Sequence, residues 1–110
     1  MILNGKAKED FFTWINRYIP NKESFECEMN INDLYFKTST ELNALIIEWL
    51  DSVGIYVSTQ VMQTPVSHKV YFECLIRSDR TKVSDFYTTR QEATEQAIIT
   101  ANEIYNDRTK

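Results

Sequence analysis

The N-terminal part of the chain spaces its large apolar side chains with a helical period. Within residues 6–19 they fall at positions i, i+3, i+4 and i+7, which form one face of an amphipathic helix. Pro20 is expected to end this helix, because proline lacks a backbone N–H to donate. The face that must find an apolar surface consists of Phe11, Trp14, Ile15 and Tyr18.

The period then changes from helical to alternating. Residues 24–31 switch strictly between apolar and polar side chains, which is typical of a half-buried β-strand. A turn is expected at residues 30–33, and residues 34–36 predict either a short strand or the lead into a helix. The apolar phase of the alternating stretch consists of Phe25, Cys27, Met29 and Ile31.

The strongest helical pattern covers residues 40–53. Thr38 and Glu41 have the spacing of a capping box at its start, and Gly54 supplies the left-handed residue expected just past its end. Trp49 lies at the centre of the apolar stripe and is expected to be almost fully buried. The stripe consists of Leu42, Leu45, Ile46, Trp49, Leu50 and Val53.

Three alternating stretches after Gly54 predict β-strands. They cover residues 55–61, 70–76 and 82–88, and turns are expected at residues 64–67 and 78–81. Because these connections are short, the strands should pair as an antiparallel meander. The predicted inner face carries Ile55, Val57, Thr59 and Val61 on the first strand and Val70, Phe72, Cys74 and Ile76 on the second.

The last quarter of the chain predicts a capped helix. Thr89 stands three residues before Glu92, so a helix should begin near Arg90. Small residues on one side of this helix allow close packing against a neighbour. The resulting fold class is α+β, with a three-strand antiparallel meander between helices in the order α-β-β-β-α. The small-residue side consists of Ala93, Ala97 and Ala101, followed by Ile104.

Length and composition predict one domain, residues 1–110. Residues 6–37 form a helix and strand extension, residues 38–106 the α-β-β-β-α core, and residues 107–110 a tail. An apolar content of 43% is enough to bury a core without metals or disulfides. No stretch approaches the length of a membrane span, and the N-terminus lacks the apolar core of a signal peptide. We therefore expect a cytoplasmic protein without membrane contact.

Groups that could support chemistry are few. Cys27 and Cys74 both fall on apolar phases, which favours buried hydrophobes, although the two could lie near each other across the sheet. His68 is the only histidine, and it stands in a predicted turn without triad spacing. Solvated faces account for the close carboxylate pairs, which are Glu26 with Glu28 and Glu92 with Glu95. We predict a non-enzymatic protein with no catalytic residue, metal site or cofactor.

Aromatic and apolar residues also occupy the outward phase of the predicted sheet. Leu75 in particular is apolar on a face that should be wet. We favour coverage of this face by the N-terminal helix, because large exposed patches are rare in monomers. The alternative is an exposed patch for a partner. The candidate interface residues are Tyr71, Leu75 and Tyr87, with Tyr56 and Phe86 as further aromatic residues that could stack on bases.

The turn between the first two core strands carries Pro65 and His68, and Phe72 follows in the next strand. In these residues, and in the order of its elements, the segment 38–106 resembles the double-stranded-RNA-binding domain. One extra residue separates Pro65 from His68. Where that family generally uses three lysines, Arg90 is the one basic residue. Candidate nucleic-acid contacts are Lys69, Arg77, Arg80, Lys82 and Arg90.

The charge balance disfavours this nucleic-acid interpretation. The net charge is −4, and acidic residues outnumber basic ones within residues 38–110. Binding to a duplex depends on neutralising phosphates with basic side chains. Duplex-RNA binding through a weakened phosphate-contact surface therefore remains the alternative function.

The chain also resembles small uncharacterised proteins of phages and prophages in three segments, which are residues 49–57, 88–93 and 101–106. The resemblance implies an accessory protein of a mobile element. The first hypothesis is thus a protein-interaction module that binds a host or phage protein. A homodimer through an open strand edge is a variant of this hypothesis.

Overall fold

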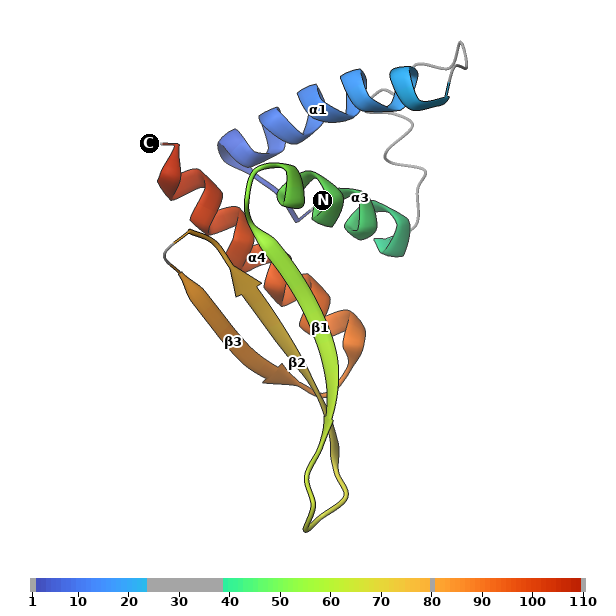
Figure 1. Ribbon diagram of the computed structural model, residues 1–110, viewed down its shortest axis with the longest axis vertical. Coiled ribbons are helices and arrows are strands. Elements are labelled where there is room, and N and C mark those ends of the chain that lie inside the picture. The colour runs from blue at the N-terminus through green and yellow to red at the C-terminus, as the bar shows by residue number, and fades with distance from the viewer. Residues whose placement is uncertain (1, 24–38, 80, 110) are drawn as a thin grey trace.

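The computed structural model describes residues 2–23, 39–79 and 81–109. Within these described residues, three helices and three strands follow one another (Figure 1). The arrangement confirms the α+β class, with an α-β-β-β-α core after an N-terminal helix. The elements are α1 (Gly5–Glu23), α3 (Ser39–Ser52), β1 (Tyr56–Gln63), β2 (Val70–Arg77), β3 (Lys82–Tyr87) and α4 (Arg90–Arg108).

The strands form the predicted antiparallel meander, in the order β1-β2-β3. Cys74 pairs with Thr59 on one side and with Asp85 on the other, and both ladders are in continuous register. Directly paired residues point to the same face of a sheet, so the register sorts every strand residue onto one of two faces. Cys74 and Ile76 are buried, and they mark the inner face.

Helix α4 covers this inner face and contacts all three strands (Figure 1). Its start agrees with the sequence, because the Thr89 side chain accepts a hydrogen bond of 3.1 Å from the Glu92 backbone N–H. Small residues at 93, 97 and 101 are fully buried. They let the helix axis approach the sheet closely, as the small-residue stripe predicts.

Helix α3 ends in a Schellman motif. Gly54 has a φ of +82°, its N–H donates to the Asp51 carbonyl, and the Ile55 N–H donates to the Leu50 carbonyl. These two bonds satisfy carbonyls that the helix end leaves open. The motif turns the chain directly into β1, with the side chain of Ile55 fully buried.

Helix α1 packs against α4 and α3 instead of the outward face of the sheet (Figure 1). The predicted coverage of that face is therefore wrong. Phe11 is fully buried, and its ring meets Trp49 edge-on at 5.9 Å between centroids. Trp49 is 2% exposed, as predicted, and its other neighbour is Tyr105 at 4.9 Å. Helix α1 thus packs on the aromatic surface of α3 and α4, and not on the outward face of the sheet as we predicted.

The helix boundary at Pro20 also differs from the prediction, because α1 continues to Glu23. A proline removes one backbone donor, which leaves the rest of the helical ladder in place. Several predictions lie outside the described residues. They are the strand at residues 24–31, the turn at residues 30–33, the element at residues 34–36, the cap at Thr38, and the side chains of Tyr18, Cys27 and Arg80.

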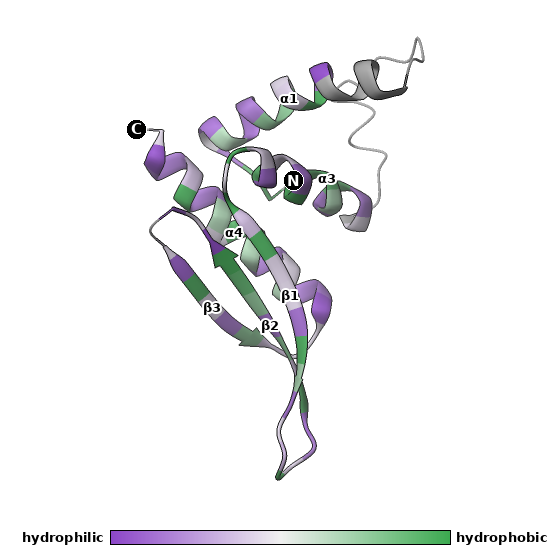
Figure 2. Cartoon of the chain, viewed as in Figure 1, coloured by the Kyte–Doolittle hydropathy of each residue, from purple (hydrophilic) through white to green (hydrophobic). Residues whose placement is uncertain are grey.

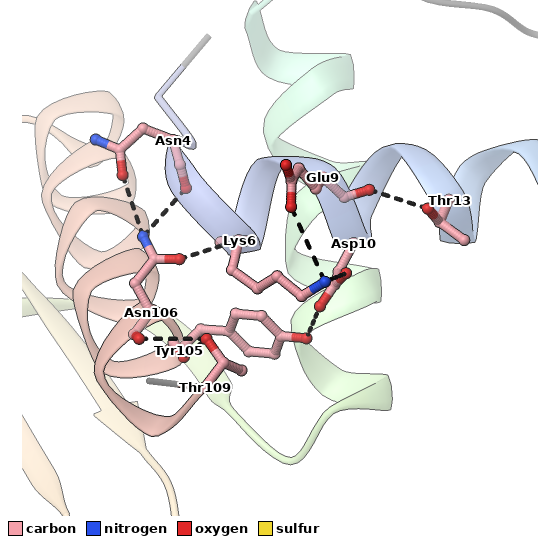
Figure 3. Close-up of polar contacts among 9 residues, drawn as sticks. Asn4, Lys6, Glu9, Asp10, Thr13, Tyr105, Asn106 and Thr109 are labelled. Carbon is pink, nitrogen blue, oxygen red and sulfur yellow. Dashed lines mark hydrogen bonds and ion pairs between the residues drawn. The ribbon is translucent and has the colours of Figure 1, made fainter.

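A cluster of polar side chains fastens the start of α1 to the end of α4 (Figure 3). Asn106 accepts a hydrogen bond of 2.8 Å from the Ala7 N–H and donates to the Asn4 carbonyl at 3.1 Å. Asn102 exchanges two bonds of 3.0 Å with Asn4. Side chains of α4 therefore cap the N-terminus of α1, in place of the usual local capping residue.

Candidate functional site

The outward face of the sheet carries exposed apolar side chains. The register places Tyr56 and Met62 of β1 beside Arg77 and Tyr71 of β2, and it places Phe86 of β3 beside Glu73. Tyr56 is 56% exposed and Phe86 is 54% exposed. We call this face the outer sheet surface; its apolar residues are Tyr56, Met62, Tyr71, Leu75 and Phe86.

The β1–β2 hairpin extends this surface beyond the N-terminal end of α4 (Figure 1). At its tip the Lys69 carbonyl accepts from the Thr64 N–H, and the Thr64 and Ser67 hydroxyls lie 2.6 Å apart. His68 has a φ of +56°, so the backbone is strained there. Val66 at the tip is 93% exposed, and Val61 and Val70 are also exposed. The projecting hairpin therefore carries exposed apolar residues among polar ones, and Figure 2 shows it in mixed green and purple.

The predicted interface residues separate onto two faces. Tyr71 and Leu75 lie on the outer sheet surface, where both are half-buried. Tyr87 pairs with Phe72 on the inner face and packs against the core, so it does not lie on the outer sheet surface. Its hydroxyl donates to Asp85 at 3.3 Å. The outward aromatic residue of β3 is instead Phe86, one position earlier.

The predicted basic contacts do not form one surface. Arg77 and Lys82 pair across β2 and β3 on the outer sheet surface. The Arg90 guanidinium lies over the Phe72 ring at 5.1 Å on the inner face, and Lys69 is in the hairpin turn. Strand β2 has eight residues, so about 23 Å separates its two ends. Arg77 and Lys82 thus lie at one end of β2 on the outer face, whereas Arg90 lies on the inner face towards the other end.

Two of the groups considered for chemistry, Cys74 and His68, lie in the part of the chain that the structure describes. Cys74 is buried, and desolvation raises the pKa of its thiol, which disfavours the reactive thiolate. His68 stands at the exposed hairpin tip. Within residues 2–23, 39–79 and 81–109, no three His, Cys, Asp or Glu side chains come together as a metal site.

A depression of about 460 Å³ lies where α1, α3 and α4 meet, with Trp14, Trp49 and Tyr105 in its lining. Its acidic residue, Asp10, accepts a short hydrogen bond from the Tyr105 hydroxyl and lies 3.2 Å from Lys6 Nζ (Figure 3). The bond from Tyr105 and the nearby Lys6 lower the pKa of Asp10, while burial and Asp10 raise the pKa of Tyr105 to about 12. Both groups are engaged with each other, so this pair stabilises the packing of α1.

Comparisons of this chain with protein-family models, with curated proteins and with solved structures give no match. In the part of the chain that the structure describes, no helix has the length and apolar character needed to cross a bilayer.

Proposed function

We propose that this protein is a non-enzymatic binding module that recognises another protein through the outer sheet surface and the projecting hairpin. One observation carries the proposal. Among the side chains whose exposure the structure describes, those of residues 2–17, 40–79 and 81–109, the exposed large hydrophobic ones all belong to the strands and their hairpin turn. They are Tyr56, Val61, Met62, Val66, Val70 and Phe86.

The composition of this surface fits a protein partner. Tyr, Phe and Met are enriched at the centres of protein interfaces, and such centres are poor in charge. Strand β1 contains no charged residue at all. Arg77 and Lys82 stand side by side at one end of the outer sheet surface, so a partner with a carboxylate near that end is favoured.

The resemblance to small phage and prophage proteins supports a partner encoded by a phage or by its bacterial host. Strands β1 and β3 each pair only with β2 in the described residues, so a second copy of the chain is another partner that this arrangement allows. Duplex RNA is a weaker candidate, because phosphate contacts would have to come from cations on two different faces.

Site-specific photocrosslinking tests the proposal. A photoreactive phenylalanine analogue is placed at Phe86, on the outer sheet surface, and at Glu103, on the exposed side of α4, as the matched control. We expect a protein adduct from position 86 and none from position 103, and the purified partner should bind the wild-type chain directly. An adduct with a second copy identifies the homodimer. Equal labelling from both positions, or adducts that nuclease removes, would refute the proposal.

A further inference from the structure

A groove of about 430 Å³ lies between α3 and α4, where α4 begins. Cavities of this size accommodate small organic molecules. Helix α3 contributes apolar lining through Ala44 and Ile47. The polar residues of the lining are Thr40 and Asn43 from α3, and Arg90, Gln91 and Thr94 from α4.

Asn43 is a polar side chain without a partner at this groove. It is 8% exposed, yet its amide takes part in none of the hydrogen bonds of the described residues. The same residues contain no fully enclosed side-chain N or O atom that lacks a partner. The Asn43 amide therefore keeps contact with solvent through the groove that it lines. A buried amide usually finds a hydrogen-bond partner, so this side chain is suited to a ligand.

The N-terminus of α4 supplies further donors at the same place. Thr89 satisfies the N–H of Glu92, whereas the N–H groups of Arg90 and Gln91 have no acceptor among the described residues. Free N–H groups and the positive end of the helix dipole attract an anion. Two independent features, the helix start and the unpartnered Asn43 amide, thus meet in one groove.

The surrounding charges limit which anion can bind. Arg90 is the only cation in the groove lining, while Glu92 and Glu95 occupy the first two turns of α4. A phosphate dianion would be repelled by these glutamates more strongly than a single negative charge. We propose that the groove binds a small carboxylate that carries an apolar group. The carboxylate accepts from the free N–H groups and the Asn43 amide, and the apolar group contacts Ala44 and Ile47.

The proposal does not depend on the protein-binding function, and NMR titration of the full chain tests it separately. The probes are 4-methylpentanoate, a free acid, and N-acetyl-L-leucine, which represents the last residue of a peptide. N-acetyl-L-leucinamide has the same apolar group without the carboxylate. We expect saturable shifts of the backbone amides at residues 40–47 and 89–94 with either acid, and none with the amide. Tighter binding of 4-methylpentanoate identifies a free acid as the source of the carboxylate, and tighter binding of N-acetyl-L-leucine identifies a peptide terminus.

Two variants and a control make the result decisive. Arg90→Gln should weaken acid binding severalfold, because the groove loses the only cation of its lining. Arg17→Gln removes the same charge from an exposed position of α1 and should leave binding unchanged. Ala44→Phe fills the groove from an exposed position and should abolish binding, while the NMR spectrum should still be that of a folded protein. Equal binding of the leucinamide, or unchanged binding in the Arg90 and Ala44 variants, would overturn the proposal.

Discussion

Replacing Asn106 by alanine should loosen α1 from the rest of the protein. The Asn106 side chain accepts from the Ala7 N–H at 2.8 Å and donates to the Asn4 carbonyl and side-chain oxygen, each at 3.1 Å. The substitution removes a helix cap, which typically costs about 1 kcal/mol, and it leaves the partly buried Ala7 N–H without its acceptor. We expect a loss of about 1–3 kcal/mol in the free energy of unfolding.

Urea denaturation measures the total loss, and amide hydrogen exchange shows where it arises. Exchange of the Ala7 amide should accelerate in Asn106→Ala, while amides of β2 should change only by the global loss of stability. Gln96→Ala, at an exposed position of the same helix, is the matched control and should change stability by less than about 0.5 kcal/mol. A stability loss equal to that of the control, with Ala7 still protected, would show that the cluster does not hold α1.

Trp49→Ala should cost about 3–5 kcal/mol in denaturant melts, since a buried ring between Phe11 and Tyr105 is lost; a cost below about 1 kcal/mol would show that the core is misassigned. Burial first, and then Asp10, raise the pKa of Tyr105 from 10.0 to about 12. Because the pKa of Tyr105 is higher in the folded state than in the unfolded state, its protonated hydroxyl stabilises the fold below about pH 10, and this stability is lost as the pH rises to about 12. Melts should therefore show stability falling between about pH 10 and pH 12, and Tyr105→Phe should flatten this dependence. Labelled duplex RNA titrated at two salt concentrations should bind no tighter than the roughly 10⁻⁴–10⁻⁶ M of nonspecific complexes; submicromolar binding that falls in an Arg90→Ala and Lys82→Ala double variant would favour the RNA alternative.

Local patterns in the sequence predicted the local structure well. The Thr89 cap, the left-handed Gly54 and the alternating strands each depend on neighbours in the chain, so a short window contains the information. The stripe at residues 93, 97 and 101 likewise predicted a helix that packs closely, because the absence of bulky side chains is visible without knowing the neighbour.

Long-range packing could not be predicted in the same way. The outward phase of β3 depends on its register with β2, which pairs Tyr87 with Phe72 and turns Phe86 outward. The position of α1 depends on competition between two apolar surfaces, the outward face of the sheet and the aromatic surface around Trp49, and α1 packs on the second. The Asn4 and Asn106 contacts join residues about one hundred positions apart, and asparagine carries no local signal for such a role.

The binding affinity of the photocrosslinked partner, measured by calorimetry with purified proteins, tests the central claim most directly. Phe86→Glu and Met62→Glu each place a carboxylate on the outer sheet surface, and each should weaken binding by at least about tenfold, as expected for residues near an interface centre. Gln96→Glu adds the same charge to the exposed side of α4 and should bind like the wild type. Equal affinities for all four proteins would contradict the assignment of the outer sheet surface as the binding site.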